Sequence, residues 1–290
     1  MSSSSSPLQY IKINGADLAY REAGDVSNQL FITLHGGRGF GSHESDFSAY
    51  LPLSTTHHIV SFDFRGHGQS SHTPPYTFSQ LVDDIESFRQ NLVAKYNKRE
   101  TKAVICGGSF GGYLAQQYAI TYPGGLSHLI LRGTAPSYEH ETEAMEVLEQ
   151  RLSRAPLASL NFLKKVFSSF VDDDEMRLVM FAIGPLYSEA EYDADIGLER
   201  ARSMRLSAKV HNDLYSEQEK YFDYRPKLKD IKAKTLIVVG HEDWICPPSQ
   251  SELIHQGIPG SQLLIVSNAN HSVHQEKNEE VIAATRKFLS

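Results

Sequence analysis

Cysteine is scarce in this sequence: only Cys106 and Cys246 occur among 290 residues. Two cysteines cannot form a disulfide framework, and we interpret both thiols as reduced packing residues. No run of eighteen apolar residues occurs, so no ordinary membrane-spanning helix is expected. The first residues, Met1 followed by five serines and Pro7, lack the basic and then apolar profile of a signal peptide. We therefore expect a cytoplasmic protein that does not insert into a membrane.

Positive charge is also scarce. Lys and Arg number 28 against 35 Asp and Glu, which leaves a net charge of -7 with no long basic run. A nucleic-acid partner is not expected from such a surface. The thirteen histidines show no metal-ligand spacing, so neither a metal ion nor another cofactor is expected. The pattern leaves the oligomeric state open.

Short apolar runs alternate with helical patterns along most of the chain, which predicts an α/β protein with a parallel sheet covered on both faces. Six runs are typical of buried parallel strands: residues 30–34, 58–62, 102–106, 128–131, 235–239 and 262–266. Two more, 10–13 and 18–21, flank Asn14-Gly15, a hairpin signal. The total is an eight-stranded, mostly parallel sheet.

The clearest helix spans residues 78–96, where apolar residues recur at helical spacing and Thr77 with Gln80 predicts a capping box. Its opposite face carries Asp83, Asp84, Glu86 and Arg89, which we expect to be half exposed to solvent.

One long segment, residues 136–226, has no strand-like run. Its helix-like stretches are Glu141–Leu152, Leu157–Phe170, Asp172–Ile183, Glu189–Leu206 and Ala208–Phe222. We interpret it as an all-helical lid over the carboxyl edge of the sheet, where open α/β folds bind ligands; the alternative is an independent bundle with no catalytic role. Residues 8–135 and 227–290 then form the core, after a tail at 1–7 that its composition predicts to be disordered.

A candidate nucleophile, Ser109, follows the apolar run 103–106 within Gly107-Gly108-Ser109-Phe110-Gly111-Gly112. A serine between glycines, at a sharp turn from a strand into a helix, has its Oγ exposed at the end of the sheet, where it can act as a nucleophile. Glycines are needed two residues before and after it because a Cβ there would collide with the neighbouring strand or helix.

A serine nucleophile needs a histidine as its base and a carboxylate to orient that histidine, in the chain order serine, acid, histidine. Asp243 follows the strand-like run 235–239, and His271 follows 262–266. We assign Asp243 as the orienting acid and His271 as the general base. Glu242 is the alternative to Asp243 as the acid. His274 is the alternative to His271 as the base, and His241 is a weaker one because it precedes the expected acid in the chain.

Acyl transfer also needs backbone donors for the oxyanion. The amide of Phe110, directly after the serine, is the first candidate. His35-Gly36-Gly37 ends an early strand, so Gly37, or else Gly36, offers the second.

In this order along the chain, the segments His35-Gly36-Gly37, Asp63–Ser70 (DFRGHGQS), Gly107–Gly112 (GGSFGG), Gly240–Asp243 (GHED) and Asn270-His271 resemble the α/β-hydrolase superfamily. The doubled glycines are most similar to those of the proline iminopeptidases. The resemblance implies an α/β-hydrolase fold, and it implies that the run 63–70 buttresses a loop beside the active site.

The chain departs from the iminopeptidase pattern at Arg38, which stands where the family has proline and would place a cation near the site. Family members hold the substrate ammonium with acids of the lid. The positions of those acids do not match securely here, and Glu217 and Glu219 are the candidates.

The sequence therefore predicts a serine hydrolase that works without a cofactor through an acyl-enzyme, on a small molecule or short peptide. We place cleavage of an amino-terminal peptide or amide bond first. The alternatives are an esterase, a lactonase or a carbon–carbon bond hydrolase. Two further alternatives belong to other functional classes: a ligand receptor that retains the hydrolase fold, and a lyase.

Overall fold

The computed structural model describes residues 6–290, so residues 1–5 of the expected tail lie outside the described part. Its strands are β1 (Gln9–Ile13), β2 (Ala16–Ala23), β3 (Leu30–Leu34), β4 (His58–Phe62), β5 (Ala103–Gly108), β6 (Leu126–Arg132), β7 (Lys234–Gly240) and β8 (Gln262–Val266). They form one sheet in the order β1-β2-β4-β3-β5-β6-β7-β8. Only the pairs β1–β2 and β2–β4 are antiparallel. The predicted eight-stranded, mostly parallel sheet is confirmed.

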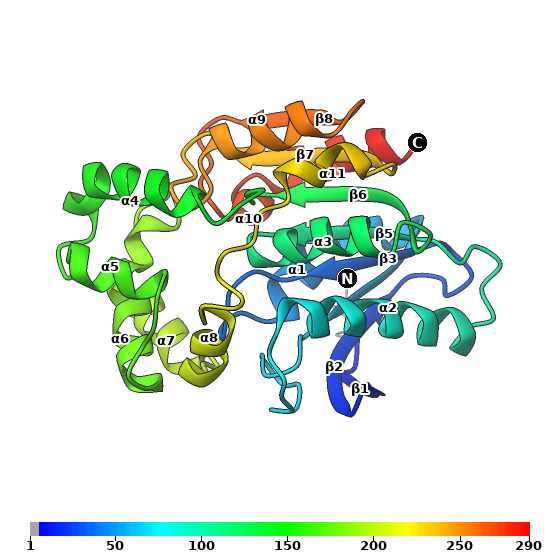
Figure 1. The fold of residues 1–290 in the computed structure, drawn as a ribbon, viewed down its shortest axis with the longest axis horizontal. Helices are drawn as coiled ribbons and strands as arrows, with labels where there is room; N and C mark the ends of the chain where they lie inside the picture. Colours follow the sequence, from blue (N-terminus) through cyan, green and yellow to red (C-terminus); the bar gives the residue numbers. More distant parts are fainter. Residues whose placement is uncertain (1–5) are drawn as a thin grey trace.

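Helices cover both faces of this sheet (Figure 1). The helices are α1 (His43–Tyr50), α2 (Phe78–Lys95), α3 (Phe110–Thr121), α4 (His140–Arg151), α5 (Leu160–Val166), α6 (Asp173–Ile183), α7 (Ala194–Ser203), α8 (Ala208–Leu214), α9 (Pro248–Gly257), α10 (Val273–Glu276) and α11 (Asn278–Leu289). Short 3₁₀ segments lie at Leu51–Thr55, Leu152–Arg154, Gly184–Leu186 and Arg225–Asp230.

Two apolar clusters, one on each face, form the core. Successive residues of β3 divide between them: Ile32 joins the cluster of α2, α3 and α9, and Phe31 joins that of α1, α10 and α11. Successive side chains of a strand point to opposite faces, so a strand buried on both sides reads as an unbroken apolar run. This is why the six runs were visible in the sequence.

Three of the four charged residues expected on the half-exposed face of α2, Asp84, Glu86 and Arg89, are buried, whereas Asp83 is partly exposed. Arg65, in the loop after β4, donates from Nε and Nη2 to the carboxylate of Asp84 at 2.5 and 2.7 Å, and both side chains are 1% exposed. Glu86 and Arg89 form a second pair at 2.6 Å. The helical period alone could not reveal the pair of Asp84, because the guanidinium that covers this carboxylate comes from a distant loop.

The chain between β6 and β7 forms α4 to α8, which gather beyond one end of the sheet (Figure 1). The two ends of this helical insertion pair with each other: Tyr138 N donates to Phe222 O at 2.9 Å, and Tyr224 N donates to Pro136 O at 2.8 Å. The predicted helix 208–222 is shorter in the structure: α8 ends at Leu214, turns follow over 215–220, and the returning chain then makes these bonds.

Candidate active site

Ser109 occupies the turn between β5 and α3, with φ 52° and ψ -121°. This backbone region is costly for a residue with a Cβ and is tolerated where the surroundings enforce it. A Cβ on Gly107 would lie 2.3 Å from the carbonyl oxygen of Gly111, and one on Gly111 would lie 2.1 Å from that of Leu34. Both flanking glycines are therefore required for the reason inferred from the sequence.

Asp243 and His271 meet at the same edge of the sheet, after β7 and β8. Nδ1 of His271 lies 2.9 Å from each oxygen of the Asp243 carboxylate. That carboxylate also accepts from the backbone N–H groups of Ile245 and Cys246, at 3.0 and 2.9 Å. Because Nδ1 donates to the carboxylate, Nε2 of the neutral ring keeps its lone pair for a proton.

Ser109 and His271 line one cavity of about 220 Å³. No hydrogen bond joins the two side chains in this structure, and such catalytic contacts often tighten only when substrate binds. The three residues expected to act together thus come from three strand ends and converge on one site.

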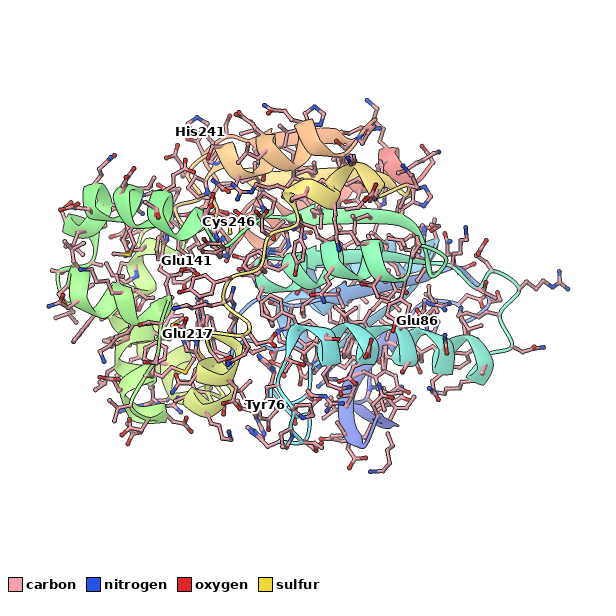
Figure 2. The ribbon with its side chains drawn as sticks, viewed as in Figure 1. Tyr76, Glu86, Glu141, Glu217, His241 and Cys246 are labelled. Carbon is pink, nitrogen blue, oxygen red and sulfur yellow. The ribbon has the colours of Figure 1, made fainter. Side chains whose placement is uncertain are left out.

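The rival residues are not part of the Asp243–His271 pair, although His274 also lines the cavity of Ser109. His241 and Glu242 hydrogen-bond to each other at 2.8 Å, with side chains 65% and 38% exposed, and His241 lies at the periphery (Figure 2). His274 is buried, with Nε2 3.5 Å from the carboxylate of Asp46. The histidine paired with Asp243 is therefore His271.

The loop after β3 passes directly beside the serine. A Cβ on Gly36 would lie 3.0 Å from the Cβ of Ser109, and Gly37 has φ +89° with no room for a side chain against Phe40. Phe110 is the first residue of α3, so its N–H has no acceptor within the helix. The glycine loop and the start of α3 can therefore offer backbone donors to one oxygen atom.

Two neutral histidines hold this loop against the run 63–70. Nε2 of His35 accepts from Phe64 N at 3.2 Å, and Nε2 of His67 accepts from Gly39 N at 2.8 Å. Burial lowers the pKa of both rings, that of His67 to about 3. The run 63–70 thus buttresses the glycine loop, in agreement with the sequence analysis.

A buried ion pair beside the serine was not predicted. Arg132, the last residue of β6, donates from Nη2 to Asp46 at 2.6 Å, and both residues line the cavity. A Cβ on Gly108 would lie 2.0 Å from this guanidinium, so the second glycine of the doublet leaves room for Arg132. A charged residue at the carboxyl end of an apolar strand was the only signal in the sequence.

The three candidate substrate-binding residues are placed differently. Arg38 lines the cavity. Glu217 pairs with Lys220 at 2.8 Å and has a side chain 73% exposed. The carboxylate of Glu219 accepts from Phe78 N at 2.7 Å, at the start of α2. The cavity lining contains neither glutamate.

Sequence reasoning missed Glu141 on α4. Its Oε1 is buried without a hydrogen-bond partner among residues 6–290, and desolvation raises its pKa to about 7, opposed by the charges of Arg38 and Lys220. Glu141 lies where the helical insertion meets the core (Figure 2).

A second cavity of about 480 Å³ lies beneath α7. It shares Phe40, Tyr187 and Ser272 with the cavity of Ser109, and much of its remaining lining is apolar, including Met180, Ile196 and Met204. The two cavities are therefore neighbours, and Ser272, directly after His271, lies at their boundary.

Within residues 6–290, no group of three or more His, Cys, Asp or Glu side chains is arranged to hold a metal ion. No helix in this part of the chain has the length and apolar character needed to cross a bilayer.

Comparisons with known proteins agree with this geometry. A proline iminopeptidase named PfmaB from Pestalotiopsis fici is 54% identical over 283 residues, which cover 97% of this chain and 99% of that protein. A proline iminopeptidase of Saccharolobus solfataricus is 26% identical, with 93% and 87% covered.

Solved structures share the fold. A hydrolase from Pseudomonas aeruginosa superposes with a TM-score of 0.72 and 24% identity over the full length of both chains. A meta-cleavage product hydrolase from Pseudomonas fluorescens gives 0.75 and 20% identity, with 97% of each chain covered. Residues 29–278 match the family described as alpha/beta hydrolase fold. The protein is thus a hydrolase and a member of the α/β hydrolase fold family.

Proposed function

We propose that the protein is a serine aminopeptidase that releases a proline residue from the amino terminus of a short peptide. The observation that carries the proposal is the 54% identity, along nearly the whole of both chains, to a protein named a proline iminopeptidase. The cavity around Ser109, at about 220 Å³, is of a size for a small acyl group.

The proposed reaction uses Ser109 as the nucleophile. Its Oγ bonds to the carbonyl carbon while His271 Nε2 takes the proton, and Asp243 stabilises the resulting imidazolium. The oxyanion accepts hydrogen bonds from the amides of Phe110 and Gly37, or Gly36. His271 returns the proton to the leaving amine as the carbon–nitrogen bond breaks. Water then attacks the acyl-serine and releases the free acid.

Glu141 is our candidate for binding the substrate's ammonium group. Like Glu217 and Glu219, Glu141 is not among the residues that line the cavity, but its charge interacts with that of Arg38, which is. Its buried Oε1 lacks a partner among the described residues, so an ammonium that reached it would supply both a hydrogen bond and a counter-charge. Glu217 and Glu219 serve less well, because Lys220 and the amide of Phe78 already occupy their carboxylates.

The cavity beneath α7 gives room for the rest of the peptide. His271 must hand its proton to the leaving group, so that group lies on the side of His271 and of Ser272, which borders this cavity. The helices above it act as the expected lid.

The test compares the 4-nitroanilides of proline, N-acetylproline and alanine, in the wild type and in Glu141→Gln. We expect proline anilide to be the best substrate. Blocking its amine or removing the charge of Glu141 should raise KM about tenfold or more with a smaller change in kcat, because a charge-assisted contact is lost. Glu217→Gln, in an exposed pair, is the matched control and should behave as wild type.

Covalent labelling of Ser109 by a fluorophosphonate, and its loss in Ser109→Ala, separates a hydrolase from the other classes. No labelling would favour a receptor. Turnover of a substrate without an acyl-enzyme in mass spectra would favour a lyase. Hydrolysis of esters but not of amides would contradict the proposed aminopeptidase activity and favour an esterase or lactonase.

We further propose a cytoplasmic location and small-molecule or short-peptide ligands, without a nucleic-acid or membrane partner. Cell fractionation tests the location directly.

A further inference from the structure

Arg38 carries a positive charge that is buried without a carboxylate partner in the described part of the chain. The residue is 3% exposed. Its Nη1 donates a long hydrogen bond of 3.4 Å to Leu214 O, while Nε and Nη2 have no partner within residues 6–290. Buried arginines are almost always paired, because an unpaired buried charge loses its hydration without replacement.

Aromatic rings surround this guanidinium. Its Cζ lies 3.9 Å from the ring centre of Tyr215, and four further centres, those of Phe78, Phe110, Tyr113 and Phe222, lie at 5.2 to 5.6 Å. Rings stabilise a cation through their faces. The rings supply no nitrogen or oxygen acceptor to Nε and Nη2, so the cage holds the charge in position while these two atoms make no conventional hydrogen bond within residues 6–290.

The cage opens onto the site of Ser109. Arg38 directly follows Gly37 in the chain, and its Cζ lies 5.6 Å from the ring centre of Phe110, so its side chain packs against one of the two residues that offer oxyanion donors. Arg38, Tyr113 and Tyr215 line the same cavity as Ser109 and His271. An acyl group bound to the serine would therefore share this cavity with Arg38, whose Nε and Nη2 are buried and unpaired within residues 6–290.

Glu141 does not neutralise Arg38 directly. The two charges influence each other, yet Oε1 of Glu141 is without a partner and no ion pair joins the two side chains. A ligand carboxylate, by contrast, matches the planar fork of a guanidinium and can accept from two nitrogens at once.

We propose that Arg38 binds a carboxylate on the acyl group, and that the protein consequently has a further activity, the hydrolysis of small dicarboxylate half-esters. Ser109 Oγ bonds to the ester carbon, and the alcohol leaves with the proton from His271. Water then cleaves the acyl-serine and releases the dicarboxylic acid. This activity uses the same triad but does not depend on the aminopeptidase reaction or on Glu141.

A purely structural role for Arg38 makes a different prediction. Its carbonyl oxygen accepts from Nδ1 of His211 at 2.9 Å, and Ser207 N donates to Gly39 O at 2.8 Å, so α8 and the residue before it hold this loop. If Arg38 only held the loop, its replacement would lower the hydrolysis of every substrate by the same factor.

The test therefore uses a ratio. The full chain is assayed with mono-4-nitrophenyl glutarate and with 4-nitrophenyl pentanoate, which have the same acyl length and differ in the terminal carboxylate. We expect the wild type to prefer the glutarate in kcat/KM. Arg38→Met should lower the glutarate-to-pentanoate ratio about 10- to 100-fold, the usual effect of losing a charged hydrogen bond. Arg38→Lys, a point charge without the fork, should lower it less.

An unchanged ratio in Arg38→Met, or a wild type that prefers pentanoate, would overturn the proposal. Should Arg38→Met fail to fold, protection of the wild type serves instead: glutarate should slow fluorophosphonate labelling of Ser109, and 1,5-pentanediol should not. Equal protection by both, or by neither, would also overturn it. If the protein does not hydrolyse prolyl anilides, only the proposed aminopeptidase activity is contradicted, since the glutarate-to-pentanoate ratio is measured on esters alone.

Discussion

Gly111 has no side chain, and this allows the first turn of α3 to pack closely against the end of β3. Alanine in a helix interior normally stabilises it by about 1 kcal/mol relative to glycine. Here the added Cβ would lie 2.1 Å from Leu34 O and 2.6 Å from His35 O, both of which are backbone atoms. Steric overlap with backbone therefore outweighs propensity. We expect Gly111→Ala to lower the free energy of unfolding by about 1–3 kcal/mol and to reduce activity, measured by urea denaturation and ester hydrolysis.

Gly124 is the matched control, because a Cβ there meets nothing within 4 Å. Gly124→Ala should leave both stability and activity near wild type. Equal stability of the two variants would show that the contact between α3 and β3 is looser than in this structure.

At the scale of elements, Arg65 joins three segments of the chain. Besides its pair with Asp84 on α2, it donates to Asn14 O at 3.2 Å and to Thr73 O at 3.3 Å. Arg65→Met would leave the Asp84 carboxylate buried without its cation, which costs about 3–5 kcal/mol of stability. The measurement is the urea midpoint and slope at neutral pH.

Lys12→Met provides the contrast, since the Lys12–Asp17 pair has side chains 69% and 53% exposed. An exposed pair contributes about 0–1 kcal/mol, so this variant should unfold close to wild type. A small effect of Arg65→Met, similar to that of Lys12→Met, would contradict the buried geometry.

At the scale of the whole molecule, three buried histidines predict acid lability. Burial lowers the pKa of His67, His140 and His211 to about 3, whereas in the unfolded chain each titrates near 6.5. Between these values the unfolded state binds more protons. Their effect on stability is absent above pH 6.5, and stability falls as the pH drops from there towards 3, because the unfolded chain binds up to one more proton at each histidine.

The check is urea denaturation between pH 4 and 7 of the wild type, His211→Phe and His72→Gln. His211→Phe should reduce the slope of stability against pH by about one proton, and His72→Gln, at an exposed position, should not. Identical slopes in all three proteins would mean that His211 titrates normally in the folded state.

Local patterns were enough to predict the sheet and to place the three proposed catalytic residues at strand ends. Apolar runs marked the core strands because strands buried on both faces alternate between two apolar layers. Ser109, Asp243 and His271 were found because each follows such a run at a strand end. Helix α1 (His43–Tyr50) was not predicted, since its eight residues carry no clear apolar period.

Contacts between segments that are distant in the chain could not be predicted from the sequence. The aromatic cage of Arg38 combines rings from α2, α3 and the chain after α8. The unpaired Oε1 of Glu141 and the Arg132–Asp46 pair are likewise not indicated by any pattern of neighbouring residues in the sequence. Backbone conformation depends strongly on neighbours a few residues apart, and so the sequence alone predicted the fold class and the order of the proposed catalytic residues along the chain. The charge each buried group faces depends on which remote segments pack against it, and for that the folded chain was needed.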